Sequence, residues 1–173
     1  MDLVTLLDEA GAAIGTAPKD DVHTAATPLH LAFSCYVLDH EGRVLITRRA
    51  LSKRTWPGVW TNSFCGHPRP GEDMIEAVVR RGTEEIGARP RDVNVVLPLF
   101  RYRAVDASGI VEHEICPVHV ARIDGAVVPD PSEVMEFIWV LPDRLGSAVE
   151  NAPFAFSPWL REQLPLLRHE GRI

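Results

Sequence analysis

The sequence is poor in cysteine, has no long apolar run and carries no excess of positive charge. Its three cysteines, Cys35, Cys65 and Cys116, are an odd number, which argues against a disulfide framework and favours a reducing cytoplasm. No run of about 18 apolar residues is present, and the N-terminal "MDLVTLLDEAG" lacks the basic segment of a signal peptide. The net charge of -6 gives no support to nucleic-acid binding. We therefore expect a cytoplasmic protein that binds neither membrane nor nucleic acid.

The chain has 173 residues, and its 46% of hydrophobic residues is enough to bury the core of a single domain, 1–173. Its positive charge is local: "TRRALSKR" at 47–54 holds four basic residues, and Arg80 and Arg81 follow later. An acidic protein with a local basic cluster favours a small anionic ligand over a polyanion. We expect the protein to be a monomer.

Apolar periodicity predicts more strands than helices, and therefore an α+β fold with mixed or antiparallel sheets and a few helices. The predicted strands cover residues 3–17 (strand, turn, strand), 30–39 and 43–49 (a hairpin), 93–105, 110–123 and 133–140. Two helices are predicted, at 72–87 and at 157–171, the second with Ser157 as N-cap and Pro158 in its first position.

The helix predicted at 72–87 carries a carboxylate that faces inward. Glu85 lies two turns beyond Val78 and follows the apolar stripe, whereas Glu84 points to a more exposed side. Arg81 precedes Glu85 by one turn, so the two can pair. An inward carboxylate beside a basic cluster can hold Mg²⁺ on a phosphate group, because Mg²⁺ binds through one or two carboxylates plus substrate oxygens.

A second set of polar residues has the composition of a metal site. Glu112 and Glu114 are two apart in a predicted strand, so both project from one face and repel unless a positive group lies between them. Together with His23, His30 and His67 they would suit Mn²⁺, Mg²⁺ or Zn²⁺. Spacing alone leaves two interpretations open, a convergent metal site and a solvated strand face.

The stretch "TNSFCGHPRPGE", residues 61–72, holds Cys65 between Phe64 and Gly66, with His67 two residues on. A free cysteine commonly packs as a small buried hydrophobe, and that is our interpretation of Cys35 in its apolar strand. For Cys65 these residues leave a structural and a functional role equally open.

From Gly66 onward the chain resembles the Nudix box, a loop–helix–loop signature of divalent metals and diphosphate-linked substrates. Gly66 is followed after five residues by Glu72, after seven more by Arg80, and then by "RGTEEIGA". Arg81 stands where a glutamate is usual, and Gly82 where a bulky apolar residue is usual. The resemblance implies a Nudix-like core at about 28–162, and the lost glutamate argues against diphosphate hydrolysis.

Five motifs are similar to the type I isopentenyl-diphosphate isomerases, a family with the Nudix fold that does not hydrolyse its substrate. They are "HTAATPLHLAFS", "TRRALSKRTWPGVWTNSFCGHP", "FRYRA", "GIVEHEICPV" and "FAFSPW", and the likeness runs from about residue 3 to residue 159. It implies an enzyme for a small allylic or homoallylic diphosphate, which interconverts isopentenyl and dimethylallyl diphosphate. The alkene is protonated, a tertiary carbocation forms, and the neighbouring carbon loses a proton.

The same resemblance implies roles for individual residues. The ligands of a divalent metal (Mn²⁺, Mg²⁺ or Zn²⁺) would be His23, His30, His67, Glu112 and Glu114. The catalytic residues would be Cys65 and Glu114, which move protons, with Tyr102 and Trp159. The diphosphate would be bound by Lys19, Arg49, Lys53 and Arg81, and its Mg²⁺ by Glu85.

Two other functions compete with the isomerase. A Nudix-type diphosphate hydrolase is disfavoured by Arg81 and by the Glu112 and Glu114 pair. A non-catalytic metal-binding module would leave Cys65, Lys53 and Trp159 without a purpose.

Overall fold

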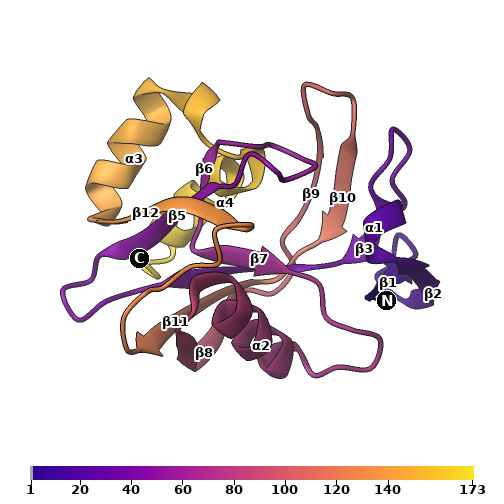
Figure 1. The fold of residues 1–173 in the computed structure, drawn as a ribbon, viewed down its shortest axis with the longest axis horizontal. Coiled ribbons are helices and arrows are strands. Elements are labelled where there is room, and N and C mark those ends of the chain that lie inside the picture. Colours follow the sequence, from indigo (N-terminus) through magenta and orange to yellow (C-terminus); the bar gives the residue numbers. More distant parts are fainter. Residues whose placement is uncertain (1) are drawn as a thin grey trace.

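The strands and helices of this chain form a mixed architecture, described by a computed structural model for residues 2–173. Within these residues the chain has three β-sheets and four α-helices (Figure 1), which confirms the predicted α+β class. In Figure 1, α2 lies at the bottom below β7, α3 lies at the upper left, and β1 and β2 near the N-terminus lie at the right. None of the described helices is long and apolar enough to cross a membrane.

The first sheet brings the N-terminal strands beside the middle of the chain. Its strand order is β2-β1-β3-β10-β9, with β1 (Leu3–Leu7), β2 (Ala13–Pro18), β3 (His30–Leu31), β9 (Arg101–Val105) and β10 (Val111–Ile115). β1 and β2 form the predicted hairpin. β3 and β10 run parallel with His30 opposite Glu114, and Tyr102 of β9 lies opposite Glu114 on the other side. The register therefore aligns three polar side chains across the sheet.

The second and third sheets carry most of the apolar strands. The second has the order β7-β4-β11-β8, with β4 (Phe33–Val37), β7 (Phe64–Gly66), β8 (Arg89–Leu97) and β11 (Val118–Asp124). The third has the order β12-β5-β6, with β5 (Val44–Arg49), β6 (Trp60–Thr61) and β12 (Val134–Val140). The predicted hairpin of β4 and β5 is present only at its turn, where Asp39 N–H donates to the Arg43 carbonyl and Leu38 pairs antiparallel with Val44. Beyond the turn β4 and β5 enter different sheets.

Three of the predicted strands are wrong in extent, because each is divided between the first and the second sheet. The divisions fall at Ala32 (between β3 and β4), at 98–100 (between β8 and β9) and at Cys116–Pro117 (between β10 and β11). Pro98 and Pro117 have no N–H to donate, so neither can continue a ladder. Apolar periodicity continues across each break and therefore did not reveal it.

Helix α2 (Met74–Ile86) matches its prediction closely. The Asp73 side chain accepts hydrogen bonds from two backbone N–H groups of the first turn, and the helix ends at Gly87, whose φ of 66° favours glycine. Val78 and Ile86 are fully buried against the second sheet, whereas Ile75 in the first turn is exposed. The packing of Val78 and Ile86 thus fixes α2, which carries Arg81 and Glu85, against the second sheet.

The remaining helices are α1 (Lys19–Val22), α3 (Pro142–Asn151), the 3-10 helix η1 (Pro153–Ala155) and α4 (Pro158–His169). α4 begins as predicted, with Ser157 accepting a hydrogen bond from Leu160 N–H. α1 and α3 were not predicted. α3 contains Gly146, a weak helix former, and is held by packing on α4, including an ion pair of 2.8 Å between Asp143 and Arg168.

Gly82 provides a test of how closely α2 approaches the sheet. A Cβ atom there would lie 2.3 Å from Pro90 Cγ and 2.9 Å from Phe64 Cζ. Replacing glycine by alanine in an exposed helix gains about 1 kcal/mol, but the Pro90 ring cannot rotate away and overpacking costs about 1–3 kcal/mol. We expect Gly82→Ala to lower the free energy of unfolding by up to about 2 kcal/mol in urea titrations. The exposed control Thr83→Ala should change it by less than about 0.5 kcal/mol, and a stabilised Gly82→Ala variant would refute this packing.

Candidate active site

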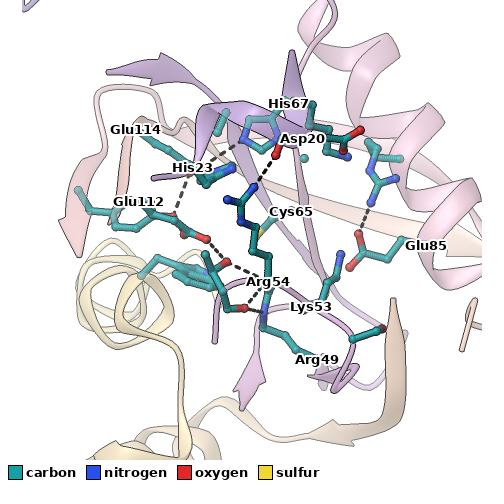
Figure 2. Close-up of a pocket in the computed structure, with 18 residues that line it drawn as sticks. Asp20, His23, Arg49, Lys53, Arg54, Cys65, His67, Glu85, Glu112 and Glu114 are labelled. Atoms are coloured by element: carbon teal, nitrogen blue, oxygen red, sulfur yellow. Dashed lines mark hydrogen bonds and ion pairs between the residues drawn. The ribbon is translucent and has the colours of Figure 1, made fainter. Parts of the chain in front are cut away.

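A cavity of about 400 Å³ lies between the first sheet, α2 and the loop that follows β5 (Figure 2). It gathers residues from α1, β5, β7, α2, β9, β10 and α4 and from the loops at their ends. All of the predicted site residues except His30 line it, namely Lys19, His23, Arg49, Lys53, Cys65, His67, Arg81, Glu85, Tyr102, Glu112, Glu114 and Trp159. The fold therefore brings together residues that are up to 140 positions apart in the chain.

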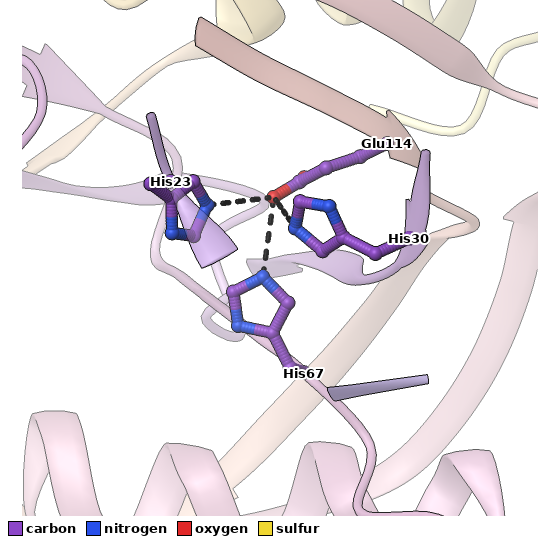
Figure 3. A group of neighbouring side chains, drawn as sticks. All are labelled: His23, His30, His67 and Glu114. Carbon is purple, nitrogen blue, oxygen red and sulfur yellow. Dashed lines mark hydrogen bonds and ion pairs between the residues drawn. The ribbon is translucent and has the colours of Figure 1, made fainter. Parts of the chain in front are cut away.

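Three imidazoles converge on one carboxylate at one end of the cavity (Figure 3). Glu114 Oε1 lies 3.2 Å from His67 Nε2, 3.4 Å from His30 Nε2 and 3.9 Å from His23 Nε2. The four side chains come from β10, from the loop after β7, from β3 and from the end of α1. Their ligand atoms all lie within 4.8 Å of one another, so one ion can contact all four.

The polar atoms of this cluster fit a cation. His30 Nδ1 lies 2.9 Å from the Pro28 carbonyl and so carries the proton, which leaves Nε2 buried, facing Glu114 and without a hydrogen-bond partner in the described chain. Burial acts to lower the pKa of His30, but Glu114 outweighs it and the pKa is raised. Burial lowers the pKa of His67 to about 4, so this imidazole is neutral at pH 7. The cluster attracts positive charge and offers nitrogen and oxygen ligands to a divalent ion.

Glu112 lies beside this cluster but outside it. Its carboxylate accepts hydrogen bonds from Thr55 Oγ1 (2.6 Å) and from Tyr102 OH (2.5 Å). Tyr102 OH also lies 3.0 Å from Glu114 Oε2, so the phenol bridges the two carboxylates. Burial, and then the charge of Glu114, raises the pKa of Glu112. Burial would also raise the pKa of Glu114, but the three histidine rings that surround it hold that pKa well below its usual range.

Cys65 and Trp159 share a buried amide as their partner. Asn62 Oδ1 lies 3.3 Å from Cys65 Sγ and accepts a hydrogen bond of 2.9 Å from Trp159 Nε1. The Asn62 amide nitrogen donates to the carbonyls of Cys35 and Phe64 (3.0 and 2.7 Å), so its orientation is fixed. Burial raises the pKa of Cys65 to about 12, partly offset by hydrogen bonds, and the side chain is a thiol at neutral pH.

The indole of Trp159 forms part of an aromatic wall. It is buried, contacts Trp56 edge-on with ring centroids 5.5 Å apart, and lies 5.8 Å from the Tyr102 ring. The Arg49 guanidinium carbon lies 5.4 Å from the centroid of the same indole. This wall separates the cavity from the core around α4.

The opposite end of the cavity is cationic. Arg81 Nη2 lies 2.6 Å from Glu85 Oε2, as the sequence predicted, and Glu85 is buried. Lys53 forms an ion pair with Glu133. Burial is the main reason that the pKa of Lys53 falls to about 8, and the nearby guanidinium groups lower it further. Burial, and then Arg81, lowers the pKa of Lys19.

Arg54 extends across the cavity in Figure 2, and its Nη1 donates a hydrogen bond to the Asp20 carbonyl. The loop after β5 is thereby tied to α1, which carries Lys19.

Sequence reasoning missed Asn62, Thr55 and Glu133, whose side chains bond to the predicted site residues. Asn62 and Thr55 fall within the "TRRALSKRTWPGVWTNSFCGHP" motif, but nothing in their spacing shows which atoms they contact. Glu133 comes some 50 residues after α2 and has no local signal at all.

The overall fold and most of the chain have clear counterparts among solved structures. Crystal structures of DR0079 from Deinococcus radiodurans and of a MutT protein from Methanosarcina mazei Go1 align with TM-scores of 0.73 and 0.65, each at 19% identity. The first alignment covers 95% of this chain and 98% of that one, and the second covers 84% and 97%. Similarity at this identity shows the fold alone.

Sequence comparison identifies the family. The NUDIX domain family model matches residues 28–167. The isopentenyl-diphosphate Delta-isomerase of Agromyces mediolanus is 63% identical over 170 residues, which are 98% of this chain and 82% of that protein. The protein of the same name from Clavibacter sepedonicus is 62% identical over 169 residues, or 98% and 89%. The chain therefore belongs to the NUDIX domain family and, within it, to the isopentenyl-diphosphate Delta-isomerases.

Proposed function

We propose that this protein interconverts isopentenyl diphosphate and dimethylallyl diphosphate. The observation that carries the proposal is that one cavity holds the Cys65 thiol and the Glu114 carboxylate near one end and a group of cations at the other. A reaction that moves a double bond adds one proton and removes another, with no net change. It therefore needs one group that carries a proton and one that can accept it.

The cationic end suits the diphosphate. Lys19, Arg49, Lys53 and Arg81 line it together, and Lys and Arg donors form strong charge-assisted hydrogen bonds with phosphate oxygens. We assign Glu85 to Mg²⁺ on the diphosphate, because it is a buried carboxylate beside these cations. Bound there, Mg²⁺ would neutralise part of the diphosphate charge. The hydrocarbon end of the substrate then extends toward Cys65 and Glu114.

In this reaction the π electrons of the alkene form a bond between the terminal carbon and the incoming proton. The neighbouring carbon is left as a tertiary carbocation. The carbon on the diphosphate side of the cation then loses a proton, and its C–H electrons form the new double bond. Cys65 and Glu114 perform these two transfers, each at its own carbon. Tyr102, which lies 3.0 Å from Glu114 Oε2, orients that carboxylate.

The aromatic wall stabilises the carbocation and excludes water. An indole face stabilises a cation by about 0.5–2 kcal/mol, and the Trp159 face is fixed by its hydrogen bond to Asn62. Water in the cavity would trap the cation as an alcohol, so a buried aromatic surface also protects the product.

The histidine–glutamate cluster is proposed to hold Mn²⁺, Mg²⁺ or Zn²⁺ through His23, His30, His67 and Glu114, with Glu112 available beside them. A divalent ion there would polarise and fix the Glu114 carboxylate. The protein itself contributes the Pro28 contact that orients His30 and the Tyr102 bridge between the carboxylates.

A Nudix-type diphosphate hydrolase is the second candidate, and the NUDIX domain match is the observation in its favour. Against it, Arg81 stands where the Nudix box usually has a glutamate, so a cation lies 2.6 Å from Glu85 in place of a further metal-binding carboxylate. We further propose that the residues that the structure describes form one domain and that the enzyme is a cytoplasmic monomer. Its three cysteines are unpaired, in keeping with a reducing compartment.

The reaction can be followed by isotope incorporation. Incubated with isopentenyl diphosphate and Mg²⁺ in D₂O, the protein should yield deuterated dimethylallyl diphosphate without free phosphate, because solvent deuterium exchanges onto the proton donor. Mass spectrometry and a phosphate assay measure the two products. Phosphate release without isomerised product would favour the hydrolase.

The two proton-transfer residues can be tested by substitution. We expect Cys65→Ala and Glu114→Gln each to lower kcat by at least about 10²-fold, the typical contribution of general acid–base catalysis. Cys35→Ala is a matched control, because Cys35 is a buried apolar residue of β4, and it should retain wild-type kcat. A folded Cys65→Ala or Glu114→Gln variant with wild-type turnover would remove that residue from the chemistry.

The metal site can be tested without measuring turnover. Mn²⁺ at about 100 times its Kd should stabilise the metal-free protein by about 2.7 kcal/mol, seen as a higher melting temperature. His67→Ala should lose this stabilisation together with the bound metal in elemental analysis. His113→Ala is the control, because His113 lies between the two glutamates but alternates to the other face of β10. Equal metal content in both variants would exclude His67 as a ligand.

A further inference from the structure

Glu133 lies in a turn just before β12 that joins two parts of the cationic end. Its backbone carbonyl accepts a hydrogen bond of 3.0 Å from Ala50 N–H, at the start of the loop that carries Lys53. In the same turn Asp130 N–H donates to the carbonyl of Glu85, also at 3.0 Å. The main chain thus fixes this turn to the basic loop and to the end of α2, and the position of Glu133 does not depend on its side chain.

The Glu133 side chain bridges two cations from different elements. One carboxylate oxygen pairs with Lys53 Nζ, and the other lies 3.6 Å from Arg81 Nη2. That same Nη2 lies 2.6 Å from Glu85 Oε2. The three side chains of Glu133, Lys53 and Arg81 are only 21%, 23% and 11% exposed, so solvent screens these contacts less than it screens a surface ion pair.

The cations need such a partner. Lys53 and Arg81 lie near Lys19 and Arg49 in a partly buried cavity, where like charges repel. Long basic side chains also lose rotamer freedom when a ligand fixes them. A carboxylate that holds both cations in place offsets their repulsion. It also fixes their side chains before the ligand binds, so less conformational entropy is lost on binding and the affinity is higher.

We propose that Glu133 is a positioning residue for the diphosphate, which acts by holding Lys53 and Arg81 at a fixed separation. This inference rests on the proposed function, since it takes these two cations as diphosphate ligands. Glu133 itself touches neither the reacting carbons nor the proton-transfer residues. Its loss should therefore weaken binding and leave the chemical step intact.

An anion at this place also repels a diphosphate, so the direction of the effect has to be argued. Four cations meet at this end, against Glu85, Glu133 and the exposed Glu84, which lies 3.0 Å from Arg81 Nη1. The end is therefore still positive with Glu133 ionised. An ammonium has three N–H donors and a guanidinium five, so Lys53 and Arg81 keep donors free for phosphate oxygens. The balance favours positioning over competition.

The experiment compares Glu133→Gln with Glu136→Gln. Glu136 is a matched control on β12, because it pairs with Arg48 of the same basic stretch at 3.2 Å and is exposed. For Glu133→Gln we expect KM for isopentenyl diphosphate to rise on the order of tenfold, the typical effect of a hydrogen bond to a charged group, with kcat within about twofold. Calorimetry with inorganic pyrophosphate and Mg²⁺ should show a Kd that rises by a similar factor. Glu136→Gln should match the wild type in all three quantities.

A KM or pyrophosphate Kd that is unchanged or lower in Glu133→Gln would overturn the proposal, as would a loss confined to kcat. If Glu133→Gln does not fold, Glu133→Asp serves instead, because its shorter side chain cannot reach both cations. A raised KM then supports positioning, and an unchanged KM overturns it. Failure of the proposed function would be seen in the wild type instead, which would bind pyrophosphate but would not isomerise isopentenyl diphosphate.

Discussion

The parallel pairing of β3 with β10 is the contact on which the site depends. It sets His30 opposite Glu114, and the antiparallel partner β9 sets Tyr102 opposite Glu114 on the other side. Beyond Ala32 and Pro117 the same two segments continue as β4 and β11, which pair in parallel within the second sheet. Because both segments cross together, the buried second sheet fixes the register of the first. The histidine–glutamate cluster therefore takes its geometry from the hydrophobic core.

Charge compensation governs the rest of the cavity. Buried carboxylates and cations are costly unless they are paired or hydrogen-bonded, and each end of this cavity meets that requirement differently. The histidines and Tyr102 surround Glu114, whereas Arg81 and Lys53 are balanced by Glu85 and Glu133. Separation of the two ends makes the cavity asymmetric, with most of its cations at one end and the Glu114 carboxylate among histidines at the other.

Between the two ends, Asn62 makes the aromatic wall and the thiol parts of one rigid unit. It accepts from Cys65 and Trp159 and donates to backbone carbonyls of β4 and β7. A fully bonded buried amide has one favourable orientation. This explains how a thiol and an indole that are 94 positions apart can keep a fixed separation.

Local sequence was enough to predict α2, with its Gly87 end and the inward Glu85, because helix periodicity and helix ends are local. The family and its expected site residues could also be read from the chain, because they fall within contiguous motifs. The division of the long strands between sheets became visible only in the folded chain, since apolar alternation does not change at the breaks. Only the tertiary structure likewise decided that Glu112 bonds to Thr55 and Tyr102, and that Glu133 reaches Lys53 and Arg81. Such contacts join segments that are distant in the chain, and pairing across that distance leaves no periodic or local signal in the sequence.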